Sequence, residues 1–393
     1  MSSRRFGLLL APLVSGIVLA STLLSAANAQ DVIKVGVITT LTGPAAPWGI
    51  AMASGVQMAA KEVNDKGGLK VGTKSYRIEV IAYDEQYKAG VAISAAQRLI
   101  SQDGARFIIG PLSSAGTLAV RDILQQNKII AIATPFTRKA LDPSAPFLFR
   151  MFSTPVEYSK PIVHWLKENL PADVRRVVIV NPNDETGWDS QDLLSSAYPQ
   201  EGFTIVGKEL FERALRDFQP ILTKLLAVKP DIIEMGTAAP ATAGLIVRQA
   251  RELGYKGRFV KIGGPGPREI VEAAGKEAAE GVINYMYTDT TNPSYQRMAE
   301  EFKKEHGHDA NDLLPIPYDA MRILMAAIQN AGTATDTEKV RQSIAKVTPF
   351  KSVLGDTIRL GGKESYGIDT QFLTPAYIGV IKDGKIPVMH QVH

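Results

Sequence analysis

The 393-residue sequence contains no cysteine, which excludes disulfides, thiolate zinc sites, iron–sulfur clusters and a cysteine nucleophile. The sequence also has little excess charge of either sign: the formal net charge is +4, and no run of Lys/Arg concentrates it. Two of these charges, Arg4 and Arg5, lie in a segment that we expect to be removed, which leaves about +2. So weak a charge argues against a nucleic-acid partner. Beyond the N-terminus, no apolar run is long enough to span a bilayer.

The N-terminal 29 residues have the pattern of a secretory signal peptide. The arginine pair precedes an apolar stretch, and the small-x-small sequence Ala27-Asn28-Ala29 follows it. The alternative is a membrane anchor, which Pro12 and Gly16 disfavour because they interrupt a stretch that is already short. The pattern therefore predicts cleavage after Ala29 and export.

Apolar runs of strand length alternate with segments of helical spacing along the rest of the chain. The first half predicts strands at 33–40, 76–84, 106–110 and 129–134, and helices at 48–65, 88–101 and 115–126. The second half predicts strands at 176–180, 203–210, 231–236, 259–262 and 282–287, and helices at 189–198, 218–226, 242–253 and 268–274.

This alternation predicts an α/β protein of two doubly wound lobes. Near-continuous apolar strands such as 177–180 indicate parallel sheets that helices cover on both faces. The predicted join is the extended segment 147–155. After residue 287 the pattern changes to helices at 294–305, 318–331 and 336–345 and strands at 358–360 and 375–381. Periodicity alone leaves open which lobe this tail joins.

Ligands of open parallel sheets bind beyond the carboxyl ends of the strands, and four turns at those ends hold candidate residues. They contain Trp48; Ser113 and Ser114; Phe136, Thr137 and Arg138; and Gly264. The two serines open a helix, whose free N–H groups would receive an anion such as a carboxylate. The plainer alternatives are a helix cap for the serines, a core residue for Trp48 and a surface charge for Arg138.

No catalytic, metal or cofactor site is predicted. The sequence lacks a Gly-x-Ser-x-Gly nucleophile turn and a phosphate-binding loop. Asp84-Glu85 is a paired carboxylate that could act as an acid/base couple or could cap the following helix, and we favour the cap. The segment His306-Gly307-His308-Asp309 could bind a metal, but a surface loop with so few histidines is weak evidence.

Several segments, in this order and spacing, resemble the periplasmic Leu/Ile/Val-binding proteins of ATP-driven (ABC) importers. They include LTGPAA (41–46), EVNDKGG (62–68), IGPLSS (109–114), RQARELG (248–254) and YDA (318–320). The resemblance runs nearly end to end after residue 30.

The resemblance implies a type I periplasmic binding protein clamshell, in which a three-segment hinge joins two Rossmann-like lobes. Lobe one would comprise 30–150 and 288–352, and lobe two 151–287 and 353–393. It further implies a monomeric, non-enzymatic receptor in the periplasm. The receptor would carry a small carboxylate or amino acid to a permease and an ATPase at the inner membrane.

Carried over by position, the resemblance assigns the ligand carboxylate to Ser114, with Ser113 adjacent. The backbone of Phe136 and the hydroxyl of Thr137 would continue this site, with Arg138 beside them, and Trp48 would contact the ligand side chain.

Three positions of the second lobe depart from the amino-acid binders. Ala238 stands where they offer a tyrosine, Thr186 stands where they offer an aromatic residue, and Gly264 with its neighbours replaces an acidic residue that binds the ligand ammonium. An ammonium without an acidic partner would be poorly compensated in a closed cleft, although Asp184 or Glu185 could substitute.

Four functional hypotheses follow. A receptor for branched-chain or other apolar amino acids ranks first on the resemblance. A receptor for aromatic or aliphatic acids without an amine ranks second on the missing acidic residue. A ligand-sensing regulatory protein would use the same fold. An exported hydrolase ranks last.

Overall fold

The structure is a computed structural model that describes residues 31–392. The predicted signal peptide and its cleavage site lie outside these residues. No helix in the described range is long and apolar enough to cross a membrane.

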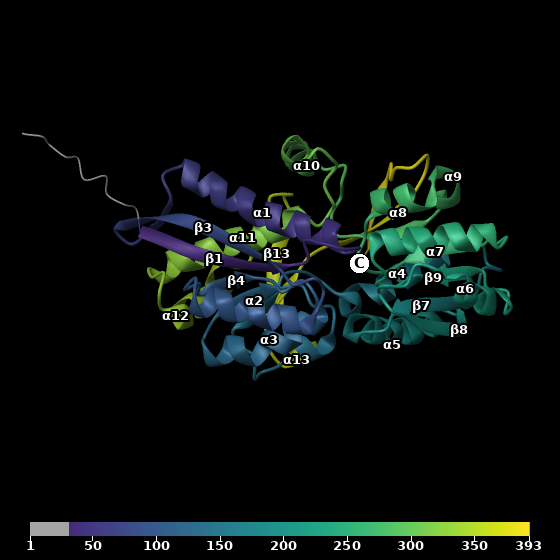
Figure 1. Ribbon diagram of the computed structural model, residues 1–393, viewed down its shortest axis with the longest axis horizontal. Helices are drawn as coiled ribbons and strands as arrows, with labels where there is room; N and C mark the ends of the chain where they lie inside the picture. Colours follow the sequence, from purple (N-terminus) through teal and green to yellow (C-terminus); the bar gives the residue numbers. More distant parts are fainter. Residues whose placement is uncertain (1–30, 393) are drawn as a thin grey trace, which may run out of the picture. The chain divides into compact units, whose positions relative to one another are not determined.

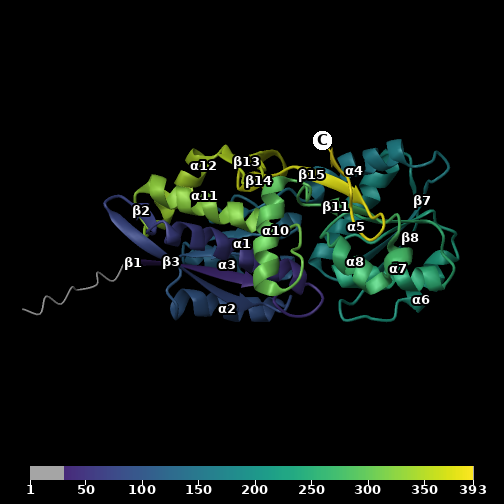
Figure 2. The same ribbon diagram turned by 90° about the horizontal axis from the view of Figure 1, so that it is seen from above.

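Two β-sheets organise the described residues (Figures 1 and 2). The nine-stranded sheet has the order β12-β13-β14-β6-β5-β4-β1-β3-β2, and the seven-stranded sheet has the order β16-β15-β11-β10-β9-β7-β8. The first consists of β1 (Asp31–Thr39), β2 (Leu69–Val71), β3 (Lys74–Asp84), β4 (Phe107–Ile109), β5 (Ile130–Ala133), β6 (Leu148–Arg150), β12 (Phe350–Lys351), β13 (Thr357–Gly361) and β14 (Gln371–Leu373). The second consists of β7 (Arg176–Pro182), β8 (Thr204–Phe211), β9 (Ile232–Glu234), β10 (Arg258–Lys261), β11 (Ile283–Met286), β15 (Ala376–Val380) and β16 (Met389–Val392).

Helices follow most of the parallel strands, as the alternation predicts. The first lobe, defined by the nine-stranded sheet, contains α1 (Ala46–Asp65), α2 (Ala89–Ser101), α3 (Ser114–Gln126), the 3₁₀ turn η1 (Arg138–Ala140), α10 (Pro293–His306), α11 (Pro315–Ala331), α12 (Thr337–Val347) and α13 (Lys363–Tyr366). The second lobe contains α4 (Pro155–Asn169), α5 (Glu185–Gln200), α6 (Gln219–Leu226), α7 (Pro240–Glu252), α8 (Pro267–Ala274) and α9 (Lys276–Ala279).

Both faces of each sheet are covered, which explains the near-continuous apolar strands. On β1, Val35 and Val37 pack in the same cluster as α1 and α11, while Ile38 packs with α2 and α3 on the other face. Strand β7 of the second sheet alternates in the same way: Ile179 faces α4 and α5, and Val180 faces α6 and α7. The α/β class and the two doubly wound lobes are thus confirmed.

The segment 147–155, predicted to be an extended join, contains a short strand and a helix start. β6 pairs parallel to β5 inside the first sheet, and α4 begins at Pro155. A capping box fixes that start, because Thr154 accepts a hydrogen bond from the backbone of the first turn while Glu157 accepts one from the backbone N–H of Thr154. A three-residue strand carries too little periodicity to be detected from sequence.

The assignment of 353–373 to the second lobe is wrong. β13 pairs antiparallel with β14, and β14 pairs parallel with β6, so these residues extend the first sheet. The chain reaches the second sheet only after Leu373. Contacts distant in sequence hold β14 in place: the buried Arg150 donates from Nη1 to Oε1 of Gln371 at 2.9 Å.

Within the described residues, the chain therefore passes between the sheets after β6, after β11 and after β14. The first and third crossings are hydrogen bonded to each other. Ser153 N donates to Oγ1 of Thr374 at 3.1 Å, and Ser153 Oγ donates to the carbonyl oxygen of Thr374 at 2.8 Å. The crossings thus form a linked hinge next to the carboxyl ends of both sheets.

Candidate ligand-binding site

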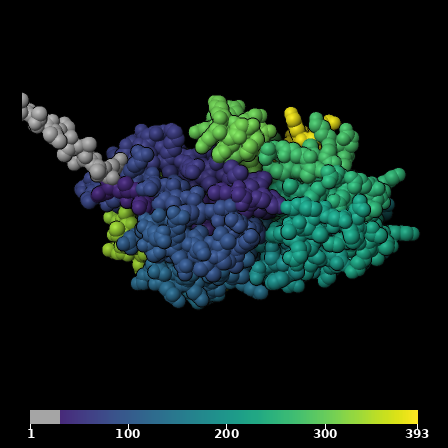
Figure 3. Space-filling model, in the orientation of Figure 1, coloured from purple at the N-terminus to yellow at the C-terminus, as the bar shows by residue number. Residues whose placement is uncertain are grey.

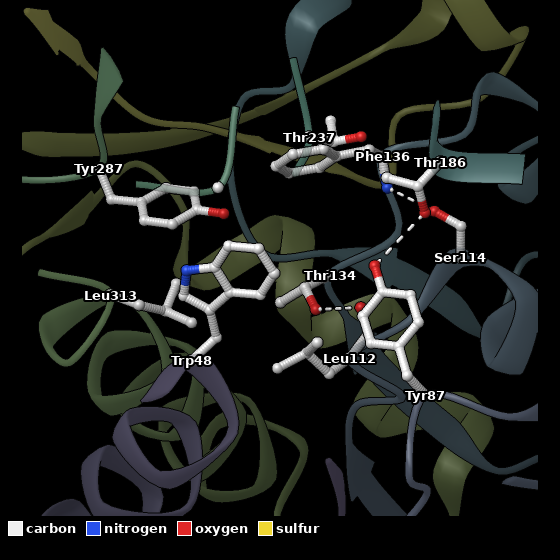
Figure 4. A pocket seen from close by; sticks show the side chains of 11 residues that line it. Trp48, Tyr87, Leu112, Ser114, Thr134, Phe136, Thr186, Thr237, Tyr287 and Leu313 are labelled. Atoms are coloured by element: carbon white, nitrogen blue, oxygen red, sulfur yellow. Dashed lines mark hydrogen bonds between the residues drawn. The ribbon is translucent and has the colours of Figure 1, made fainter. Parts of the chain in front are cut away.

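A pocket lies where the carboxyl-end loops of the two sheets face each other (Figure 4). The first lobe contributes Trp48, Tyr87, Leu112, Ser114, Thr134, Phe136 and Leu313; the second contributes Thr186, Thr237 and Gly264; and Tyr287 comes from the second crossing. Four of these side chains are aromatic and four carry a hydroxyl group besides that of tyrosine. Within residues 31–392, no acidic and no basic side chain belongs to this lining.

Trp48 and Gly264 close one wall of the pocket. Trp48 Nε1 donates to the carbonyl oxygen of Pro265 at 2.7 Å, which joins α1 to the loop after β10. Gly264 has φ +51°, and a Cβ there would lie 2.4 Å from Cζ2 of Trp48. Glycine is thus required at this position by the backbone and by the indole ring together.

The two serines at the start of α3 have different roles. Ser113 caps the helix: its Oγ accepts a hydrogen bond from Gly116 N at 2.9 Å, and the residue is fully buried. Ser114 lines the pocket, and its Oγ accepts from Phe136 N at 3.0 Å. Because this hydroxyl accepts from the backbone, its proton is free to be donated to a ligand oxygen.

Thr137 and Arg138 lie outside the pocket and connect the two lobes. Thr137 Oγ1 donates to Oδ2 of Asp189 on α5 at 2.6 Å, and Arg138 N donates to the same oxygen at 2.6 Å. The Arg138 guanidinium contacts Asp189 and Asp192. On the face shown in Figure 3, atoms of the first lobe (purple and blue) accordingly lie against those of the second (teal).

Asp184, one proposed partner for a ligand ammonium, is engaged elsewhere. It caps α5 through Gly187 N and forms an ion pair with Arg213, whose guanidinium lies 4.1 Å from the centroid of the Tyr87 ring. Neither Asp184 nor Glu185 lines the pocket. No carboxylate among residues 31–392 therefore belongs to the lining of the pocket.

Of the nine residues predicted for the site, Trp48, Ser114, Phe136, Thr186 and Gly264 line the pocket, and Ser113, Thr137, Arg138 and Ala238 do not. In the loop after β9, the prediction selected Ala238, but the residue that lines the pocket is the preceding one, Thr237. Ala238 is instead buried in the core of the second lobe.

Sequence reasoning did not select Tyr87, Leu112, Thr134, Thr237, Tyr287 and Leu313. Tyr87 closely follows the predicted strand 76–84 and Tyr287 ends the predicted strand 282–287, so the carboxyl-end rule alone could have found them. Leu313 lies in an irregular loop before α11, where no periodic signal exists.

Asp84 and Glu85 accept hydrogen bonds from the backbone of two neighbouring loops of the site. Asp84 accepts from Leu41 N at 2.9 Å, and Glu85 accepts from Ser113 N at 2.6 Å. Glu85 is fully buried, and its Oε2 has no hydrogen-bond partner among the described residues. Burial raises the pKa of the Glu85 carboxyl from 4.5 to about 7.

Glu85→Gln is expected to remove part of the pH dependence of stability. Between pH 4.5 and 7 the unfolded chain loses the Glu85 proton while the folded protein keeps it, so wild-type stability falls as pH rises. From pH 5 to pH 8, the free energy of unfolding of the variant should rise by about 2.5 kcal/mol relative to that of wild type, as measured by urea unfolding. Glu79→Gln, exposed on the preceding strand β3, is the control. An unchanged pH slope in Glu85→Gln contradicts this account.

The described residues contain no group of three or more His, Asp or Glu side chains that could hold a metal ion. His306 Nε2 is 2.9 Å from Ser54 Oγ, and His308 Nδ1 is 3.1 Å from the carbonyl oxygen of Asp309. Among the described residues, no histidine lines the pocket beside Ser114.

Two doubly wound lobes, three crossings and a pocket at the facing strand ends define the type I periplasmic binding protein fold. The chain belongs to the periplasmic binding protein family, whose sequence pattern matches residues 32–385. The resemblance to Leu/Ile/Val-binding proteins is thereby confirmed.

Relatives share the architecture at low identity. The Leu/Ile/Val-binding protein BraC3 of Rhizobium johnstonii is 27% identical over 343 residues, which cover 86% of this chain and 90% of that protein. The leucine-binding protein LivK of Thermotoga maritima superimposes with a TM-score of 0.79 at 24% identity, over 92% of this chain and 98% of that one. A solute-binding protein of Rhodopseudomonas palustris in complex with benzoate gives 0.76 at 19% identity, over 92% and 96%. These proteins are named as binding proteins rather than enzymes.

Proposed function

We propose that this protein is the periplasmic receptor of an ABC import system and that its ligand is a small aromatic or branched carboxylic acid without an amine. The observation that carries the proposal is a pocket shared by both lobes that offers aromatic rings and hydroxyl groups but no acidic side chain. Cleavage after Ala29, action as a monomer and delivery to a permease and an ATPase belong to the same proposal.

Ser114 is the proposed anchor for the carboxylate. Its proton is available, and it begins α3, where the helix dipole favours an anion. Thr134 and Thr186 add hydroxyl groups to the same lining. The rings of Trp48 and Phe136 offer flat apolar surface for the rest of the ligand.

An apolar amino acid is the second candidate. The names of BraC3 and LivK favour it, and the sequence alone ranks it first. The pocket reverses this order, because a buried ammonium needs an acidic partner and the lining supplies none. The Rhodopseudomonas palustris protein, which has the same fold, was solved in complex with benzoate, an acid without an amine, and this supports the proposed ligand class.

Thermal melts of the refolded protein against a panel of acids and amino acids test this proposal. Refolding removes any ligand carried through purification. A ligand at a hundred times its dissociation constant adds about 2.7 kcal/mol, which raises the melting temperature by several degrees. We expect the largest shifts with amine-free acids. The absence of any shift contradicts the receptor proposal, and larger shifts with leucine, isoleucine or valine contradict the ligand class.

A further inference from the structure

A fully buried lysine lies directly behind one wall of the pocket. Lys261 ends β10 with no exposed surface, and its Nζ donates to the carbonyl oxygen of Gly236 at 3.2 Å and to that of Gly263. These glycines immediately precede the lining residues Thr237 and Gly264. The Nζ atom also lies 5.8 Å from the centroid of the Trp48 ring. The charged end of Lys261 is therefore held between two of the loops that the second lobe presents to the pocket.

This ammonium has no carboxylate in ion-pairing distance among residues 31–392. Glu234, on the neighbouring strand, is committed to other donors: it accepts from Tyr198 OH at 2.6 Å, from Gly236 N at 2.8 Å and from Ile262 N at 2.9 Å. A buried cation without a contacting anion is costly. A ligand carboxylate in the pocket would supply the missing negative charge.

The same loops have little left to offer a ligand ammonium. Lys261 occupies the carbonyl oxygens of Gly236 and Gly263, and the carbonyl oxygen of Pro265 accepts from Trp48 Nε1 and from Asn311 Nδ2. An amine placed at this wall would face a positive charge and acceptors that are already engaged.

We propose that Lys261 sets the charge specificity of the pocket: its buried ammonium attracts the ligand carboxylate and disfavours a ligand that also carries an amine. The inference rests on the proposed receptor function and deepens it by assigning the preference to one side chain. Lys261 acts through the wall of the pocket rather than by direct contact, so it is a specificity-determining residue outside the lining.

The ionisable groups that face Lys261 are Glu234 on β9, Arg213 after β8 and Asp312 before α11. Burial lowers the pKa of Lys261 to about 7. A bound carboxylate favours the charged lysine, so binding should be accompanied by proton uptake above pH 7. Affinity for an acid should therefore fall as pH rises through this range.

The test compares ligands that differ only in the amine: 3-phenylpropanoate with phenylalanine, and 4-methylpentanoate with leucine. Titration calorimetry at pH 6.5 gives the ratio of acid to amino-acid affinity for wild type and for Lys261→Met. We expect the acid to bind wild type more tightly, and the substitution to weaken acid binding about ten- to a hundredfold. Affinity for the amino acid should stay the same or rise, so that the ratio collapses. Lys256→Met, exposed in the loop before β10, is the control and should keep the wild-type ratio.

A folded Lys261→Met variant that keeps the wild-type ratio overturns the inference while the receptor proposal stands. If wild type binds neither class of ligand, the result contradicts both the receptor proposal and the inference. If Lys261→Met does not fold, the acid is titrated against wild type at pH 6 and pH 9. A loss of about tenfold or more supports the inference, and an affinity independent of pH overturns it.

Discussion

Gly264→Ala is expected to weaken ligand binding about a hundredfold while the protein still folds. The new methyl group would lie 2.4 Å from Cζ2 and 2.7 Å from Cη2 of Trp48, well inside van der Waals contact. Because Trp48 and Gly264 belong to different lobes, the clash is relieved either by separating the lobes or by forcing the indole into the pocket. Overpacking of this kind costs about 3 kcal/mol, which corresponds to the stated loss of affinity.

Gly254→Ala is the matched control for this substitution. Gly254 also has a positive φ, +86°, but an added Cβ would meet nothing within 4 Å. Both variants therefore carry the same kind of backbone strain, and only one carries the clash. Titration calorimetry of both should show loss of binding for Gly264→Ala alone. Equal affinities for the two variants would contradict the closed arrangement of Trp48 against Gly264.

Trp48→Ala is expected to reduce affinity by a hundredfold or more. The substitution removes a large ring from the pocket and breaks the hydrogen bond of 2.7 Å to the carbonyl oxygen of Pro265. Aromatic anchors of this kind contribute about 2–4 kcal/mol to binding. Trp48→Phe keeps an aromatic ring but loses the hydrogen bond, so it should reduce the affinity for the ligand only about tenfold.

Tryptophan fluorescence gives an independent measurement of the same prediction. The chain has three tryptophans, of which Trp48 alone lines the pocket. Ligand binding should change the emission of wild type and of Trp165→Ala, and the change should be largely lost in Trp48→Phe. If Trp48→Ala binds as tightly as Trp165→Ala, Trp48 does not contact the ligand.

The carboxyl-end rule explains why much of the site is predictable from sequence. Trp48, Ser114, Phe136 and Gly264 all follow predicted strands, and parallel strands bring such turns to one edge of each sheet. Which of two adjacent residues faces the pocket depends on the backbone of the turn. Thr237 faces it and Ala238 does not, a difference that the sequence Gly236-Thr237-Ala238 does not reveal.

Short strands and the contacts of buried charged side chains could not be predicted from the sequence. β14 has three residues, so its place in the first sheet depends on tertiary contacts such as that between Gln371 and Arg150. Lys261 follows two apolar residues at the end of a predicted strand, where nothing in the sequence shows that its ammonium turns back to the carbonyl oxygens of Gly236 and Gly263. The charge of the site thus becomes visible only when the loops are assembled.

The central claim is that this receptor binds a small carboxylate whose amine-free form it prefers. The most direct test is a calorimetric titration of the refolded wild-type protein with 4-methylpentanoate and, separately, with leucine, two ligands of the same carbon skeleton. The account predicts saturable binding of one ligand per chain and at least about tenfold tighter binding of the acid, the equivalent of 1.4 kcal/mol. Tighter binding of leucine would contradict it, because the pocket would then hold an ammonium partner that its lining does not contain.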